Sequence, residues 1–301
     1  RYDEAVRRSV STVAVVSLVS GFILLVLGAL LARPILEAMS APADVIDLAK
    51  EYLTIYFCGM PFMMVYNFGS AVFRSVGDTK LPFYSLLVAT LCNLVLDWVF
   101  VAVFDMGVAG VAWGTVISNG VNAAIIVFFL TREAEPVTLS ITRWSVSAPD
   151  LKKMLQIGVP AGLQGMVFSV SNIFIQSAIN RFGADAIAGS SAALTYEAYC
   201  YYVVVAFCAA TIAFAGQNYG AGLYDRCKRV AAICMFYSVA VCGVANFLIV
   251  WQQQACIGVF TSDAAVVHYA SVRFHTVLVF QSLASSYEIA GAYMRGLGYS
   301  L

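Results

Sequence analysis

Residues Val10–Ala32 read V-S-T-V-A-V-V-S-L-V-S-G-F-I-L-L-V-L-G-A-L-L-A, a stretch without a charged side chain. A helix of about 20 apolar residues is long enough to cross the hydrocarbon core of a membrane. Seven further stretches share this character: Tyr52–Phe73, Leu81–Phe104, Gly107–Leu130, Leu155–Ile179, Ala186–Ala215, Val230–Trp251 and Tyr269–Met294. They are too long for membrane strands and lack the alternation of apolar and polar residues that such strands show. The sequence therefore predicts an all-α integral membrane protein with eight transmembrane helices, because helices satisfy their own backbone hydrogen bonds in lipid.

The composition excludes several classes of protein. Hydrophobic residues make up 61% of the 301 residues and charged residues only 11%, whereas a soluble domain carries about 25% charged residues. A soluble enzyme, a nucleic-acid-binding protein and a disordered segment are therefore excluded. The eight cysteines include no C-x-x-C pair, so they indicate neither disulfides nor a zinc site. We interpret them as small residues at contacts between helices.

The connections between the predicted spans alternate in basic character. Thirteen of the 17 Lys and Arg residues lie on the side that holds Arg1–Arg8, Arg74–Lys80, 132–153, Gly216–Arg229 and Arg295. By the positive-inside rule this side faces the cytoplasm, which predicts a multi-pass protein of the plasma membrane. The polar stretch 132–150 is then a cytoplasmic linker between two halves of the chain.

The chain contains an internal repeat. Tyr66–Gly77 (Y-N-F-G-S-A-V-F-R-S-V-G) aligns with Tyr287–Gly298 (Y-E-I-A-G-A-Y-M-R-G-L-G) at an offset of 221 residues. Near the start of the chain, Tyr2-Asp3 matches Tyr224-Asp225 at an offset of 222. Six predicted spans separate the two copies, and an even number means that both copies run through the membrane in the same direction.

The repeat predicts that the chain holds only part of each half. The spans at 155–215 have no counterpart before residue 1, and those at 81–130 have none after Leu301. We expect an intact protein of twelve helices in two parallel six-helix lobes. This chain then contains the last four spans of an N-lobe (1–131), the linker (132–150) and the first four spans of a C-lobe (151–301).

An acidic residue lies at mid-span in the first half. Thr90, Asn93 and Asp97 are spaced to lie on one face of a helix, and Thr115 is predicted at a similar depth on the next helix, after a short turn near Asp105. Carboxylate, amide and hydroxyl oxygens are suited to Na⁺, and a carboxylate can instead carry a proton. A structural cluster of hydrogen bonds between helices is an equally good interpretation of the spacing.

Two further acids lie inside predicted spans of the second half. Glu197 follows Tyr196 in the tyrosine-rich run T-Y-E-A-Y-C-Y-Y, which is typical of an aromatic belt or of an acidic and aromatic wall for organic cations. Glu288 lies near the cytoplasmic end of its span, where it either reaches toward the interface or lines a substrate cavity. The repeat places Asn67 at the position equivalent to Glu288.

Several motifs together resemble the multidrug and toxic compound extrusion (MATE) family. They are F-R-S-V-G-D-T-K-L-P at Phe73–Pro82, N-L-V-L-D-W-V-F at Asn93–Phe100, G-V-P-A-G-L-Q at Gly158–Gln164, G-Q-N-Y-G-A-G at Gly216–Gly222 and M-R-G-L-G-Y-S at Met294–Ser300. The resemblance extends over essentially the whole chain. It implies a twelve-helix, two-lobed transporter with the shape of an inverted V. It also implies cation-coupled export of amphipathic, often cationic compounds by alternating access, without enzymatic activity.

The resemblance also implies roles for particular residues. In prokaryotic members a cation site in the N-lobe uses an Asn and an Asp four residues apart on one span and a Thr on the next. Asn93, Asp97 and Thr115 match these positions. The coupling ion is Na⁺ or H⁺, and no other metal or cofactor is implied. Some branches carry a Glu on the first C-lobe span where this chain has Phe168, which argues against a coupling site of that type and leaves Glu197 and Glu288 as weaker candidates for one.

Two other functions are compatible with parts of the sequence. A lipid-linked saccharide flippase shares the two-lobed architecture, but it needs a basic cavity, and only Arg273 lies deep in a predicted span. A membrane-embedded enzyme needs a catalytic set such as H-E-x-x-H or paired aspartates, and the sequence contains neither. We therefore expect a monomeric antiporter in the lipid bilayer. Its partners are drugs or toxic organic cations, with no nucleic acid among them.

Overall fold

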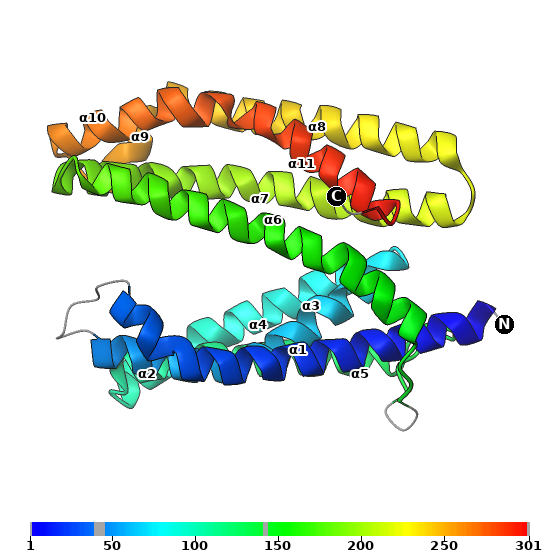
Figure 1. The fold of residues 1–301 in the computed structure, drawn as a ribbon. Coiled ribbons are helices and arrows are strands. Elements are labelled where there is room, and N and C mark those ends of the chain that lie inside the picture. Colours follow the sequence, from blue (N-terminus) through cyan, green and yellow to red (C-terminus); the bar gives the residue numbers. More distant parts are fainter. Residues whose placement is uncertain (1, 39–45, 141–143, 300–301) are drawn as a thin grey trace. The chain divides into compact units, whose positions relative to one another are not determined.

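The computed structural model describes residues 2–38, 46–140 and 144–299. Within these ranges the chain is helical and contains no strand, which confirms the predicted all-α class. It divides into two compact units, Arg1–Lys152 and Lys153–Leu301, which run from blue to green and from green to red in Figure 1.

The first unit is organised around α5 (Gly107–Leu130). The other elements are α1 (Tyr2–Ala38), α2 (Ile46–Cys58), α3 (Met60–Ser75), α4 (Lys80–Trp98) and the π-helix η1 (Val99–Val103). α5 packs against α2, α3 and α4, and α1 packs against α2 and α3. Phe73 and Ile126 are fully buried where α3 and α5 meet, so an apolar core lies between α1, α3 and α5.

The second unit contains two long helices joined by a short turn, α7 (Ala184–Gly220) and α8 (Tyr224–Trp251). They are followed by α9 (Gln253–Gly258), α10 (Ala264–Arg273), the π-helix η2 (Phe274–Leu278) and α11 (Val279–Gly296). α7, α8 and α11 pack against one another, and α10 packs on α7. α6 (Ala148–Asn180) begins in the first unit, continues into the second and buries no residue.

The spans agree with the sequence in kind but not in number. In the described part of the chain six helices are long and apolar enough to cross a membrane, or up to seven if the bent pair α2 and α3 forms one span. This pair bends by 44° at Gly59, two residues before Pro61, which lacks a backbone N–H. The predicted span Tyr269–Met294 falls on α10, η2 and α11 and is not among the seven. The predicted count of eight is therefore not confirmed.

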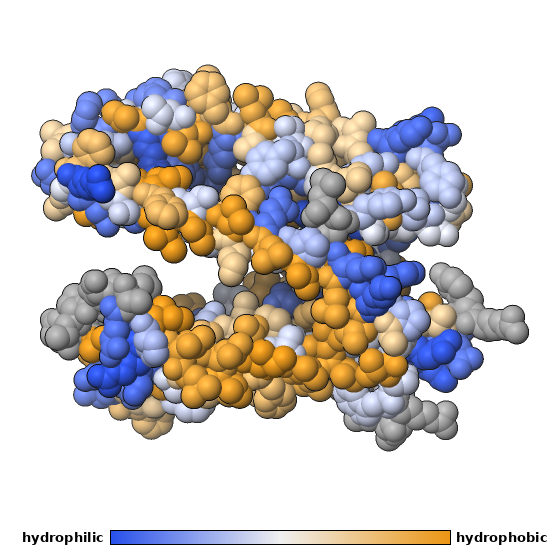
Figure 2. All heavy atoms as spheres, in the orientation of Figure 1, coloured by the Kyte–Doolittle hydropathy of each residue, from blue (hydrophilic) through white to orange (hydrophobic). Residues whose placement is uncertain are grey.

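The surface of the first unit suits a lipid environment. Figure 2 shows apolar side chains gathered along the middle of α1, where Phe22 and Leu30 are 57% and 69% exposed. Soluble monomers rarely leave such large apolar surfaces in water. These side chains are therefore expected to face acyl chains or other helices of a membrane protein.

The repeat found in the sequence has a structural counterpart at the ends of α3 and α11. α3 ends at Ser75 and α11 at Gly296, 221 positions apart. Two residues further on, Gly77 and Gly298 have φ values of 93° and 83°. This left-handed conformation is the usual way in which a glycine terminates a helix.

The contacts between helices repeat as well. In the first unit α1 approaches α3 at Gly21, where an added Cβ would stand 2.5 Å from the Cα of Pro61. In the second unit α8 approaches α11 at the equivalent Gly243, where the nearest atom is the Cβ of Ser282 at 3.8 Å. The same pair of positions therefore forms a helix contact in both units, and the contact is tighter in the first.

Candidate functional site

Asp97 is the penultimate residue of α4, which η1 follows directly. Its Oδ1 accepts a hydrogen bond of 3.3 Å from Nδ2 of Asn93, one helical turn earlier, and both side chains are half-buried. The structure therefore brings together two of the predicted ligands. Thr90 is exposed, and its hydroxyl donates to the carbonyl oxygen of Leu86 at 2.8 Å.

The α5 side of this site is formed by a glycine. A Cβ added at Gly114 would stand 2.1 Å from Oδ1 of Asp97, so the carboxylate lies directly against the bare backbone of α5. Thr115 is the next residue, but its hydroxyl donates to the carbonyl oxygen of Val111 in its own helix at 3.1 Å. The structure thus places Thr115 beside the site without a hydrogen bond from its hydroxyl to Asp97.

Gly110 and Gly114 form a G-x-x-x-G pattern on α5. An added Cβ at Gly110 would come within 2.9 Å of the Cβ of Phe100 in η1. Small residues spaced in this way let membrane helices approach closely. The pattern explains why α4 and η1 pack tightly on α5, but by itself it does not specify which side chain lies against Gly114.

The turn that closes this hairpin agrees with the sequence. η1 ends at Val103, α5 begins at Gly107, and Asp105 between them has a φ of 52°, a conformation that Asp adopts more readily than most residues. The wider i→i+5 hydrogen bonding of η1 shows in the bond of 3.0 Å from Phe104 N to the carbonyl oxygen of Val99. Such π-helical turns occur frequently at functional sites.

Asp97 has no cationic partner in the described ranges. The salt bridges found there join Arg33 to Glu37, Lys228 to Asp225 and Arg273 to Glu197. No described group of three or more His, Cys, Asp or Glu side chains is arranged to hold a metal. A half-buried carboxylate with one amide donor favours a partner that relieves its charge, either a proton or a cation.

Glu197 occupies a different environment from the one expected of a belt residue. It is only 8% exposed, and its two carboxylate oxygens accept from Nε and Nη2 of Arg273 at 2.6 and 2.9 Å. Nη1 of Arg273 donates to Oγ of Ser190 at 2.8 Å, and Gln281 donates to the carbonyl oxygen of Glu197 at 2.9 Å. Glu197 and Arg273 thus form a buried, two-pronged ion pair that joins α7 to the end of α10.

Tyr196 also points into the second unit. Its hydroxyl donates to the carbonyl oxygen of Cys256 at 2.8 Å, and its ring packs edge-on against Phe260 and Phe274. The neighbouring Glu197 is therefore held by polar contacts, and Tyr196 by both polar and aromatic ones. Neither the pairing of Glu197 with Arg273 nor the inward position of Tyr196 follows from the sequence pattern.

The acidic and aromatic arrangement considered for Glu197 occurs instead around Glu288. Glu288 is half-buried and accepts from the hydroxyl of Tyr201 at 3.4 Å. The adjacent Tyr287 stacks on Phe168 of α6, with ring centroids 6.2 Å apart. Asn67, the counterpart of Glu288 in the first unit, is exposed, and its side-chain amide donates to the carbonyl oxygen of Met63. Sequence reasoning missed the grouping because Phe168 and Tyr201 lie on other helices.

The chain is similar to known transporters over most of its length. A family model described as MatE matches residues 2–99 and 160–301, which include Asn93 and Asp97 but not Thr115. The probable multidrug resistance protein YoeA of Bacillus subtilis is 28% identical over 303 residues, which are 98% of this chain and 65% of YoeA. The multidrug export protein MepA of Staphylococcus saprophyticus is 22% identical over 254 residues, 84% of this chain and 56% of MepA.

A solved structure, a crystal structure of MATE in complex with MaD3S, has the same fold. Its TM-score is 0.87 at 22% identity, over 98% of this chain and 69% of that one. The chain thus spans less than two thirds of the length of the two curated relatives, 65% and 56%.

Proposed function

The chain belongs to the multidrug and toxic compound extrusion (MATE) family, and from this premise we propose that it acts in secondary active export. The exported compounds are amphipathic or cationic organic molecules, and the counter-ion is Na⁺ or H⁺. We place the protein as a monomer in the plasma membrane, with residues 132–150 on the cytoplasmic side. The names of YoeA and MepA, a multidrug resistance and a multidrug export protein, support the substrate class.

The observation that carries the proposal is the environment of Asp97. Asp97 is half-buried, accepts a hydrogen bond from Asn93 and packs closely against Gly114. It lies in the hairpin of α4 and α5, which the π-helix η1 interrupts. A bound cation or proton relieves the cost of this negative charge, so its occupancy changes the relative stability of two conformations of the lobe. Export is then coupled to the ion because each ligand shifts the same equilibrium.

For the organic cation we propose Glu288 as the recognising acid. Tyr201, Tyr287 and Phe168 are each 44% to 47% exposed and supply aromatic surface beside the half-buried carboxylate. Aromatic faces attract organic cations, and a nearby carboxylate adds an ion pair. Glu197 is less suited to this role because Arg273 already neutralises it.

The flippase alternative receives no support from the second unit. A pyrophosphate group needs uncompensated cations, and the one guanidinium deep in a predicted span, that of Arg273, is bound to Glu197. Export of drugs therefore remains the better proposal.

The test is transport by the purified protein in sealed vesicles under imposed Na⁺ or pH gradients. We expect uphill movement of a cationic dye when one of the two gradients is applied and none when both are collapsed. Transport that proceeds equally without either gradient would contradict coupled export. Movement of a lipid-linked pyrophosphate in place of the dye would favour the flippase.

A further inference from the structure

The start of α6 and the residues just before it are hydrogen-bonded to the side of α1. Backbone N–H groups of Ser145 and Ser147 donate to the hydroxyls of Ser11 and Thr12 at 2.8 and 2.9 Å, and both hydroxyls belong to buried residues. One turn away, Ser9 donates to the carboxylate of Asp150 at 2.8 Å. Residues 144–150 are therefore held in a defined position against α1.

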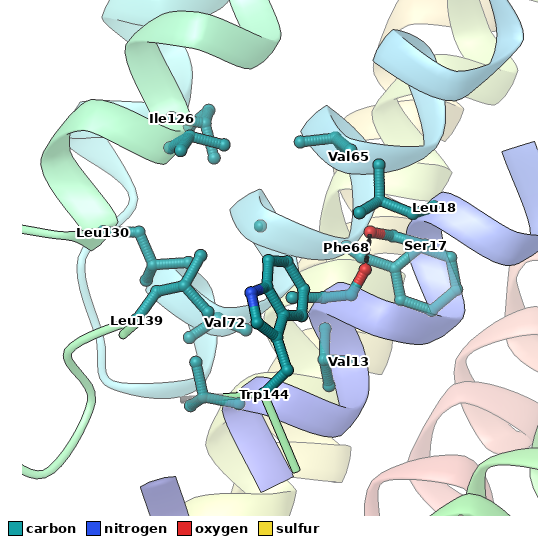
Figure 3. Close-up of a pocket in the computed structure, with 14 residues that line it drawn as sticks. Val13, Ser17, Leu18, Val65, Phe68, Val72, Ile126, Leu130, Leu139 and Trp144 are labelled. Carbon is teal, nitrogen blue, oxygen red and sulfur yellow. Dashed lines mark hydrogen bonds between the residues drawn. The ribbon is translucent and has the colours of Figure 1, made fainter. Parts of the chain in front are cut away.

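This segment covers a cavity in the first unit. The cavity has a volume of about 200 Å³ and lies between α1, α3 and α5, and Leu139 and Trp144 also line it. Figure 3 shows Trp144 among the side chains that line it, together with Val13 and Leu18 of α1, Phe68 of α3 and Ile126 of α5. The indole of Trp144 is 46% exposed, so it forms a wall that is also accessible from outside.

The lining of the cavity is apolar. Two lining side chains carry a polar group, Ser17 and Trp144, and the hydroxyl of Ser17 already donates to the carbonyl oxygen of Ala14 at 2.7 Å. A buried water needs two or more polar partners, and cavities that lack them stay dry and bind apolar molecules. The cavity therefore suits an apolar ligand better than water or an ion.

Size and shape narrow the class of ligand. A dry cavity of about 150 Å³ holds benzene, whereas whole drug-sized ligands occupy clefts of about 300–1,000 Å³. The present cavity fits one aromatic ring or two fused rings, and the rings of Trp144 and Phe68 offer aromatic surface to them. An acyl chain is a poorer fit because it gains apolar contact with these rings but not the stacked or edge-on ring packing that an aromatic ligand adds.

The cavity is separate from the Asp97 site. Ile126 lies twelve residues beyond Gly114 on α5, which corresponds to about 18 Å along a helix. It also lies at the end of the unit that carries the basic connections, where α1 begins and α5 ends.

We propose that this cavity is a binding site for the apolar aromatic part of small molecules, with Trp144 as one of its walls. The proposal extends the proposed export function, because it assigns the first unit a site for the aromatic portion of the exported compounds, on the side from which they are taken up. Binding itself does not depend on transport, so the two can be tested separately.

The experiment uses the fluorescence of Trp144 as the only tryptophan, after replacing three others by Phe: Trp98, Trp113 and Trp251. Bromobenzene is titrated into the purified protein in lipid nanodiscs, because its heavy atom quenches a neighbouring indole. We expect saturable quenching that is lost in Ala14→Phe, which fills the cavity. Ala29→Phe is the matched control, since Ala29 is equally half-buried on the same helix but about 22 Å further along it.

Equal quenching in both variants would overturn the proposal, because it would show only partition of bromobenzene into lipid. Phospholipids with brominated acyl chains test lipid as the alternative ligand. If they quench Trp144 and bromobenzene does not displace them, the cavity is assigned to lipid. If Ala14→Phe fails to fold, Val72→Phe fills the cavity from α3 and must give the same loss. Saturable binding of bromobenzene without dye transport would support the site and contradict the export function. Dye transport without saturable binding would contradict the site alone.

Discussion

Arg273→Met tests the ion pair in the second unit. The substitution removes both bonds to the carboxylate of Glu197, at 2.6 and 2.9 Å, and leaves that acid 8% exposed without its cation. Breaking one partner of a buried pair costs about 3–5 kcal/mol. Replacing both partners by apolar residues is often neutral. We therefore expect Arg273→Met to destabilise the protein strongly and the double variant Glu197→Met, Arg273→Met to recover most of the loss.

The assay is equilibrium unfolding in mixed micelles, followed by circular dichroism, for the wild type, both single variants and the double variant. The coupling energy from this double-mutant cycle should be about 3 kcal/mol or more. Arg33 and Glu37 provide the control, since their bond of 2.8 Å joins side chains that are 55% and 56% exposed, and solvent should make their coupling far smaller. A coupling energy for Glu197 and Arg273 no larger than that of this exposed pair would refute the reasoning.

Four other substitutions probe the remaining contacts. Gly114→Ala places a methyl carbon 2.1 Å from Oδ1 of Asp97, so the carboxylate must shift. The half-saturating concentration of the coupling ion should then rise by about tenfold, which equals 1.4 kcal/mol, and an unchanged ion titration would contradict this. Gly21→Ala should lower the unfolding free energy by about 1–3 kcal/mol through overpacking, whereas Gly243→Ala should leave it unchanged or raise it, and thermal denaturation of the two side by side decides. Glu288→Gln should change which cations are exported while their dependence on the ion gradient persists, as measured with a panel of dyes; an unaltered panel would remove Glu288 from substrate recognition.

Much of the fold was predictable because lipid imposes simple rules on sequence. An apolar stretch such as Val10–Ala32 has no stable alternative to a helix in a membrane, and it forms part of α1. The turn at Asp105 and the bend at Gly59 follow from local chemistry and are observed. The interruption of the predicted span Tyr269–Met294 by η2 was less predictable, because no sequence periodicity indicates a π-helix.

The candidate sites were predictable only where their residues share one helix. Asn93 and Asp97 are four residues apart, and helix geometry alone brings them together. The contact of Asp97 with Gly114 depends on how α4 packs on α5, which residue spacing within one helix does not specify. The same holds for Glu197, whose partner Arg273 is 76 residues away. Pairing of this kind is a property of the tertiary structure.

The coupling role of Asp97 is tested most directly by measuring uphill export by Asp97→Asn in sealed vesicles with an imposed ion gradient. The substitution keeps the size of the side chain and removes its charge, so the protein should fold and bind drugs but lose gradient-driven export. Asp105→Asn is the control, because Asp105 is an exposed acid in the same hairpin with a φ of 52° that Asn also adopts, and it should export normally. If Asp97→Asn exports with the ion dependence of the wild type, Asp97 is only a structural hydrogen-bonding group and the proposed coupling is wrong.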